Sequence, residues 1–323
     1  MKIKFLHSVY FVGCVFLFTI LSTVALASDS IVVQLKWFHD AQSAGFYAAI
    51  DQGFYKKENL DVTLLPGGPK VHSVNQLVNN TAQVAVAGSH ELLTRHAEGH
   101  PIVATAAIYQ QNPFVYFSLE SSNIETPLQF KGKRLLFYKD DPILKPMLSK
   151  FGLTTKDLIT IDHGTASFDS FLAGKETDIW TGYLSDQVMH ARRKGKKINV
   201  IHPEDYGISS YSEIIITTDS YLKMNPQTHT KFLKATFKGW EWAVNNPKQA
   251  AKLALKHDSQ LDETHLYDTL ISSIPYIKTD VPIGTMTMEK WEQTYKFQFE
   301  NTSALKNDLS KAINLKFLEK IYK

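Results

Sequence analysis

The chain has 323 residues, of which 44% are hydrophobic and 21% are charged, with 35 Lys and Arg against 32 Asp and Glu. This composition is ordinary for a globular protein and argues against disorder, and the length suffices for two lobes with separate cores. Lys2 and Lys4 lie at the extreme N-terminus, so the remaining charge is nearly balanced, which argues against nucleic acid or an anionic membrane as partner.

Residues 1–27 have the pattern of a secretory signal. Two lysines precede an apolar run from Val9 to Leu26, and Ala25-Leu26-Ala27 offers small residues for cleavage after Ala27. The run is also near the length of a bilayer span, so an uncleaved anchor is the alternative. The single cysteine, Cys14, lies inside this segment, so the mature chain would have no disulfide and no thiolate metal site. We expect a periplasmic protein, secreted by a cleaved signal.

The first predicted strand is the apolar run Ile31–Leu35. It stops at a polar and aromatic loop, and apolar positions resume at helical spacing from Ala44 onward. A loop at the carboxyl end of a strand, opening into a helix, is where open α/β sheets place their ligands. Polar residues follow Trp37, so it need not be a core residue. The alternative is that it fills the core at the end of the strand. The polar candidates, which could instead be solvated, are His39, Asp40 and Gln42.

The pattern of strands and helices continues along the chain. Predicted strands lie at 62–65, 84–87 and 101–108, with helices at about 70–79 and 91–98. Ser89 is a natural N-cap for the second of these helices, and a ligand could share this site because helix N-termini attract polar groups. Residues 109–113 are the first candidate crossing between lobes.

A second alternation of strands and helices follows the crossing. Glu213 begins an Ile-rich strand that we interpret as the return crossing, and a glutamate there needs a buried partner. The sequence is helical from there to the end. The prediction is an α/β fold with lobe one at 29–111 plus 214–323 and lobe two at 112–213. The other predicted elements are strands 114–117, 130–137, 158–161, 178–180, 198–201 and 213–218, a loop at 181–183, and helices from Asp141-Pro142, at 167–173 and at 227–245.

Motifs for chemistry are few. The best local histidine pair, His96 and His100, straddles Glu98-Gly99 at a helix end and is typical of surface histidines, so we predict no metal site. The sequence has no serine nucleophile elbow, phosphate-binding glycine loop or zinc-binding helix motif, which weakens an enzyme interpretation.

Several segments resemble a known family in the correct order. The opening KWFHDAQSAGFYAAIDQGFYKKENLDVTLLPGG, then VNNTAQVAVAGSHELLTRHAEGHPIVATAAIYQQNP, FKGKRLLF and HPEDYGISSYSEIIITTDSYLKMNP, look like periplasmic binding proteins related to the thiamine-pyrimidine synthases. This resemblance implies a two-lobed, type II (Venus-flytrap) binding-protein fold with a helical C-terminal region. It also implies an ABC-importer component that binds a small flat heterocycle between its lobes and delivers it to a permease at the inner membrane.

The resemblance also implies roles for residues. Trp37 would stack on the ring of the heterocycle, and Tyr183 matches an aromatic position of the family. Tyr211 and Glu213 lie in SSYSE, which resembles a YYE-like segment whose carboxylate accepts from an exocyclic amine of a pyrimidine. We expect a thiamine-precursor pyrimidine as ligand first and a riboflavin-like ring second, with a monomeric protein and no cofactor.

Two alternatives remain open. The first alternative is a solute-sensing subunit. It is suggested by WFHDAQSAGFYAA, which is closer to the WFHQAQFAGYYAA form of sensor-fused and riboflavin-type members than to the WFPN form of the pyrimidine binders. A pyridoxal-phosphate-dependent pyrimidine synthase is the other, but the family's active-site lysine falls on Ala87 and its histidine on Glu91, or on His90 after a slip of one residue. The region of its cysteine motif, Ile208–Glu213, has no cysteine.

Overall fold

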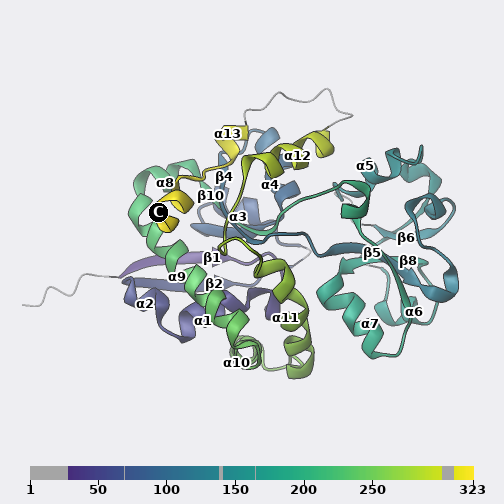
Figure 1. The fold of residues 1–323 in the computed structure, drawn as a ribbon, viewed down its shortest axis with the longest axis horizontal. Helices are drawn as coiled ribbons and strands as arrows, with labels where there is room; N and C mark the ends of the chain where they lie inside the picture. Colours follow the sequence, from purple (N-terminus) through teal and green to yellow (C-terminus); the bar gives the residue numbers. More distant parts are fainter. Residues whose placement is uncertain (1–27, 69, 138–140, 164, 300–308) are drawn as a thin grey trace, which may run out of the picture.

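The structure is a computed structural model that describes residues 28–68, 70–137, 141–163, 165–299 and 309–323. The predicted secretory signal, residues 1–27, lies outside the described residues. Two halves lie side by side, each built on its own five-stranded sheet (Figure 1). We call the half with the N-terminal strand lobe one and the other half lobe two.

Lobe one is built on a mixed sheet in the order β2-β1-β3-β10-β4. β1 pairs in parallel with β2 and β3, as expected for strands joined by helices, whereas β10 is antiparallel to β3 and β4. The strands of this sheet are rich in Ile, Val and Ala because helices cover them. They are β1 (Asp29–Gln34), β2 (Leu60–Leu65), β3 (Val84–Ala87), β4 (Ile102–Tyr109) and β10 (Ser212–Thr218).

Lobe two repeats this architecture with the order β7-β6-β8-β5-β9. β6 is parallel to β7 and β8, and β5 is antiparallel to β8. Its strands are β5 (Phe114–Leu119), β6 (Arg134–Phe137), β7 (Ile159–Asp162), β8 (Ile179–Tyr183) and β9 (Ile198–Ile201). Its helices are α5 (Leu144–Ser149), α6 (Phe168–Leu172) and α7 (Met189–Arg193), with a π-helical turn, η5 (Leu184–Val188), before α7.

The remaining helices pack on lobe one. Helices α1 and α9 approach each other closely because each has a glycine at the contact, Gly45 in α1 and Gly239 in α9. The predicted helical C-terminal region is confirmed, because the regular elements found after β10 in the described residues are helices. The helices are α1 (Ala44–Asp51), α2 (Phe54–Lys57), α3 (Ser73–Val78), α4 (Ser89–Ala97), α8 (Asp219–Met224), α9 (Pro226–Asn245), α10 (Pro247–Leu253), α11 (Glu263–Ile277), α12 (Met288–Phe299), α13 (Leu309–Ala312) and α14 (Lys316–Tyr322).

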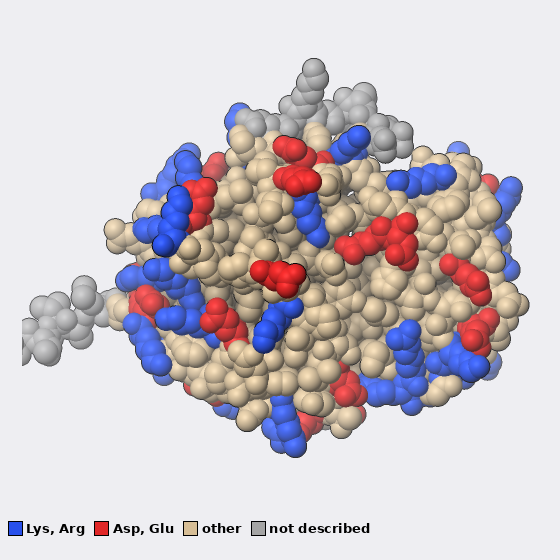
Figure 2. Space-filling model, viewed as in Figure 1, with Lys and Arg blue, Asp and Glu red and all other residues tan. Residues whose placement is uncertain are grey.

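The chain passes between the lobes twice. It leaves lobe one after Tyr109 and returns from lobe two after Ile201, so β4 and β10 are neighbours where the lobes join. The lobe boundaries at residues 111/112 and 213/214 stay a prediction. Figure 2 shows cationic and anionic side chains interspersed on the visible face, as expected from the similar numbers of Lys and Arg (35) and of Asp and Glu (32).

Four local predictions need correction. The loop predicted at 181–183 is instead the end of β8, which pairs with β5 as far as Tyr183. Ser89 is not the N-cap of α4, since Gly88 takes that place and Ser89 Oγ donates to the Tyr211 carbonyl at 2.8 Å. The strand predicted at 130–137 begins only at Arg134, because Pro127–Phe130 forms a 3-10 turn with a capping box and Gly132 has φ +73°. The helix predicted from Asp141-Pro142 begins at Leu144, and Asp141 accepts from the Ile143 and Leu144 amides ahead of it.

Candidate ligand-binding cleft

A cavity of about 350 Å³ lies between the lobes and takes its lining from both. Lobe one contributes the loop after β1 and the start of α4, and lobe two contributes the start of β5, the segment that follows β6, and the end of β8 with the turn after it. The two chain crossings supply the rest. The lining residues are Lys36, Trp37, Gln42, Gly88, His90, Glu91, Asn112, Phe114, Asp141, Pro142, Ile143, Gly182, Tyr183, Gln187 and Ser212.

The loop after β1 is held against the turn that follows β2. The Gln34 side chain donates to the Leu65 and Pro66 carbonyls, at 3.3 and 2.9 Å, and the Gly67 amide donates to the Trp37 carbonyl at 2.8 Å. A Cβ on Gly67 would lie 2.3 Å from the Leu35 carbonyl oxygen, so only glycine permits this approach. Trp37 is thereby fixed at the cavity wall.

Trp37 is half-buried and lies in the lining, so it is not a core residue. Its ring meets Phe38 edge-on, with 5.3 Å between ring centroids. Tyr183 and Phe114 line the cavity from lobe two. Aromatic side chains from opposite lobes suit a flat ligand, because offset or edge-on contact with a ring adds about 0.5–1.5 kcal/mol beyond area burial.

A buried polar network lies at one side of the cavity and joins the lobes. Lys36 Nζ is 2.7 Å from Glu213 Oε1 and donates to the Tyr183 hydroxyl. Tyr183 in turn donates to Glu213 Oε1 at 2.9 Å and lies 2.7 Å from Ser212 Oγ. The glutamate that the sequence predicted to need a partner therefore has one, and that prediction is confirmed.

Electrostatics keep Lys36 charged. Burial alone would lower the pKa of Lys36, but the Glu213 carboxylate and the Tyr183 hydroxyl outweigh it and raise the pKa above its ordinary value. Burial and the same carboxylate raise the pKa of Tyr183 to about 12. Glu213 has φ +48°, a conformation that costs energy for a residue with a side chain and that its contacts compensate.

The start of α4 brings two further titratable groups to the cavity. Burial lowers the pKa of His90 to about 4, against the effect of its hydrogen bond to Gln298, so the ring is neutral at pH 7. Burial raises the pKa of Glu91, although Lys36 opposes this shift. In the sequence, His90 and Glu91 stood out only as positions that match the histidine of the synthases, and Lys36 only as a member of the loop after the first strand.

Of the eight residues predicted to bind ligand, Trp37, Gln42 and Tyr183 line the cavity. Glu213 lies directly behind this lining, with Oε1 taken by Lys36 and Tyr183. Ser89 is fully buried and holds the chain crossing through Tyr211. The binding role of each residue stays a prediction.

The other three predicted residues are not in the lining and make contacts within the protein. His39 stacks on His257, with 4.8 Å between ring centroids, and burial followed by the nearby His257 lowers its pKa. Asp40 caps the turn by accepting from the Gln42 amide at 2.8 Å, and burial raises its pKa well above its usual range. The Tyr211 hydroxyl accepts from the Thr287 amide at 3.0 Å.

The position matching the synthase lysine, Ala87, is fully buried in β3 and is not part of the lining. In the described ranges, no three His, Cys, Asp or Glu side chains are placed to hold a metal ion. Within the same ranges, no helix combines the length and the apolar character needed to cross a bilayer.

Comparison with known proteins identifies relatives of this architecture. The family model described as "NMT1/THI5 like" matches residues 40–250. The formylaminopyrimidine-binding protein of Halalkalibacterium halodurans is 21% identical over 276 residues, which cover 83% of this chain and 84% of that protein. The riboflavin-binding protein RibY of Chloroflexus aurantiacus is 20% identical over 283 residues, covering 83% and 80%.

The relatives include enzymes as well as binding proteins. A 4-amino-5-hydroxymethyl-2-methylpyrimidine phosphate synthase of Candida albicans is 25% identical over 242 residues, covering 70% of each chain. Among solved structures, the periplasmic aliphatic sulphonate binding protein SsuA of Escherichia coli superposes with a TM-score of 0.68 at 17% identity, covering 88% of this chain and 92% of that one. The fold is that of the type II periplasmic binding proteins, as predicted.

Proposed function

Because the chain belongs to the NMT1/THI5-like family, we propose that it is the solute-binding component of an ABC importer and holds a small flat heterocycle between its lobes. The observation that carries this proposal is the cavity of about 350 Å³ to which both lobes contribute an aromatic wall, Trp37 and Tyr183. A ligand that touches both walls binds best when the lobes are closed, and so favours closure by hinge motion.

The ligand of first choice is a thiamine-precursor pyrimidine, and a riboflavin-like ring is second. Relatives named for binding formylaminopyrimidine and riboflavin support the ligand class. The cavity volume of about 350 Å³ supports the order, because it lies near the lower end of the range of about 300–1,000 Å³ for ligand pockets. A single ring with small substituents fits that space better than a tricyclic flavin with its ribityl chain.

Delivery to a membrane permease is the expected role of the closed form. The proposal includes cleavage of the signal after Ala27, a periplasmic location and a monomeric protein. The hinge would be the two crossings around residues 111/112 and 213/214. Relatives that are components of ABC importers support a transporter as partner.

A ligand panel tests the proposal. Thermal shift and calorimetry are run with an aminopyrimidine carrying a hydroxymethyl group, with riboflavin, with alkanesulfonates, and with amino acids and sugars. We expect the aminopyrimidine to raise the melting temperature most. If alkanesulfonates, amino acids or sugars stabilise the protein and no aromatic heterocycle does, the ligand class is wrong.

A separate assay addresses the synthase alternative. The protein is incubated with pyridoxal phosphate and iron, and the absorbance spectrum and pyrimidine formation are followed. We expect neither a lysine-linked imine band nor product, because Ala87 stands where the synthase lysine is expected. Turnover would replace the transport proposal with an enzymatic one.

A further inference from the structure

Two residues of the cavity lining, His90 and Glu91, have hydrogen-bond acceptor capacity that the protein does not fill. His90 is 5% exposed and lies in the lining. Gln298 donates through Nε2 to Thr94 Oγ1 at 2.7 Å and to the His90 carbonyl at 3.1 Å, which leaves its Oε1 for His90 Nδ1 at 3.0 Å. An amide oxygen only accepts, so Nδ1 of His90 carries the proton and Nε2 of the neutral ring is an acceptor. That buried Nε2 has no hydrogen-bond partner in the part of the chain that the structure describes.

Glu91, the next residue, adds a carboxylate to the same lining. Its side chain accepts a hydrogen bond from the Val74 amide and lies within electrostatic reach of Lys36, His72 and Arg95. One hydrogen bond uses a fraction of the acceptor capacity of two carboxylate oxygens. Asp141 differs, because it accepts from the Tyr116 hydroxyl at 2.6 Å and from the amides ahead of α5 at 2.8 and 3.1 Å. Glu91 is therefore the lining carboxylate with capacity left for a ligand.

The charge of the lining also disfavours an anion. Lys36 is the lining cation, and its ammonium group is already paired with Glu213 at 2.7 Å. The N-terminus of α4 faces the cavity through Gly88, but its first turn carries the Glu91 carboxylate. A sulfonate or phosphate would have to displace Glu213 from Lys36 or approach Glu91, and both cost electrostatic energy in a site with little water.

We propose that His90 and Glu91 act as a pair of acceptors that selects a heterocycle with an exposed amino or ring N–H donor and rejects its phosphate ester. This inference rests on the proposed function and adds specificity-determining residues to it. A ligand without the donor leaves two desolvated acceptors unpaired, and a site built around polar groups discriminates most strongly against ligands that fail to satisfy them.

The experiment compares three probes by calorimetry: a hydroxymethyl aminopyrimidine, its analogue with methyl in place of amino, and its phosphate ester. In the wild-type protein we expect the amino probe to bind at least about tenfold tighter than either of the others. Glu91→Gln keeps the side-chain volume and should reduce this preference about tenfold, and His90→Phe should reduce it further. Glu98→Gln, an exposed position at the end of the same helix, is the matched control and should leave the preference unchanged.

The outcomes separate the two proposals. If the wild-type protein binds none of the probes but binds riboflavin, the pyrimidine ligand and the acceptor pair that selects it both fail. If it binds neither the probes nor riboflavin, the proposed heterocycle function fails as well. If it binds the amino and methyl probes equally, or binds the phosphate ester tightest, the acceptor pair is refuted while the proposed function stands. The wild-type comparison needs no variant, so it decides the matter even if Glu91→Gln or His90→Phe fails to fold.

Discussion

Trp37 and Trp291 have the same side chain in different surroundings. Trp37 is half-buried at the cavity wall, whereas Trp291 is fully buried in lobe one. Trp37→Ala should weaken every flat ligand and leave the free energy of unfolding of the free protein nearly unchanged, whereas Trp291→Ala should lower it by about 3–5 kcal/mol. Denaturant unfolding and calorimetry on both variants check this. A loss of stability in Trp37→Ala as large as in Trp291→Ala would assign Trp37 to the core.

Lys36 and Glu213 form a pair of which each member needs the other. Their side chains are 26% and 5% exposed, so Glu213→Gln leaves a largely desolvated ammonium group without its counter-charge. The expected loss of unfolding free energy is about 2–3 kcal/mol, between the values for exposed and buried pairs. Adding Lys36→Met should recover part of it. Glu120→Gln breaks an exposed pair with Lys197 and should cost under about 0.5 kcal/mol, and equal losses in both single variants would contradict this interpretation.

His229 makes stability depend on pH. It is fully buried on α9, with Nε2 2.9 Å from Thr105 Oγ1, and burial lowers its pKa to about 3 from 6.5. Between these values the unfolded chain binds a proton that the folded protein does not, so stability is complete above about pH 6.5 and falls as the pH drops toward 3. In His229→Gln, the decrease of the unfolding free energy with falling pH should be less steep, by up to about 1.4 kcal/mol per pH unit. Unfolding at pH 7, 6, 5 and 4 measures this, and an unchanged slope in His229→Gln would contradict it.

At the level of elements, helices α1 and α9 meet through glycines. A Cβ on Gly239 would lie 2.2 Å from the Gly45 carbonyl oxygen and 2.7 Å from Ala49 Cβ. Gly239→Ala gains about 1 kcal/mol of helix propensity, but backbone atoms cannot move aside as a side chain can, so overpacking should win and the variant should be less stable by about 1–2 kcal/mol. Gly88→Ala, with φ −84° and open space around it, should cost under about 1 kcal/mol, from the preference for glycine over alanine at an N-cap. A more stable Gly239→Ala would mean that the helices can separate.

The strands were largely predictable because apolar runs with β-branched residues mark them, and 84–87 and 198–201 match β3 and β9 residue for residue. Local start signals were less reliable. Gly88, not Ser89, caps α4, because Ser89 is drawn to the Tyr211 carbonyl, a contact that spans 122 positions. The cavity shows the same limit: an aromatic residue after a strand pointed to Trp37, but the pairing of Lys36 with Glu213 spans 177 positions and exists only once the lobes meet.

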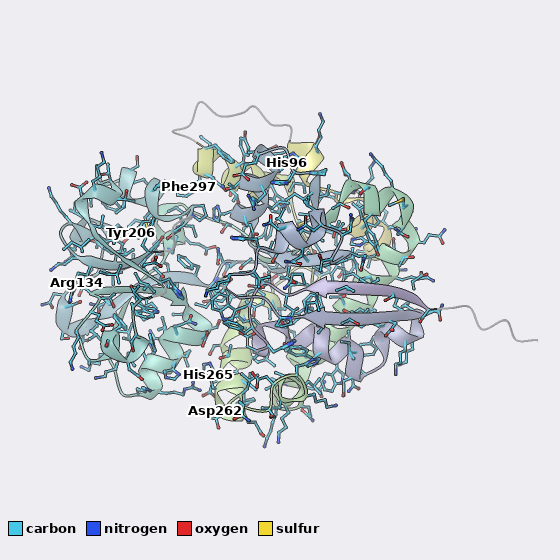
Figure 3. The ribbon with its side chains drawn as sticks, turned by 180° about the vertical axis from the view of Figure 1, so that it is seen from behind. His96, Arg134, Tyr206, Asp262, His265 and Phe297 are labelled. Carbon is cyan, nitrogen blue, oxygen red and sulfur yellow. The ribbon has the colours of Figure 1, made fainter. Side chains whose placement is uncertain are left out.

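In the whole molecule, a second polar cluster joins the lobes outside the cavity lining, and we call it the latch. Arg193 of α7 contacts Asp268 of α11 at 2.6 Å and also His265, and His265 Nε2 lies 2.9 Å from Asp186 Oδ1 in η5. Figure 3 shows His265 where α11 faces lobe two. The latch therefore holds lobe two against α11 in this arrangement of the lobes.

Asp268→Asn removes the ion pair of the latch without changing volume, and it should let the lobes separate more easily. Because half-exposed pairs contribute about 0.2–1 kcal/mol, we expect the dissociation constant for ligand to rise about two- to fivefold, chiefly through faster dissociation. Stopped-flow dissociation measures the rate, and small-angle scattering should give a larger radius of gyration for the free protein. Glu263→Gln is the matched control, because Glu263 lies on α11 like Asp268 but pairs with Lys252 of α10, at 2.9 Å, within lobe one. Raising the ionic strength should reproduce the effect of Asp268→Asn in the wild-type protein and add little in the variant. If Glu263→Gln speeds dissociation as much as Asp268→Asn, the effect belongs to α11 itself and the latch does not couple the lobes.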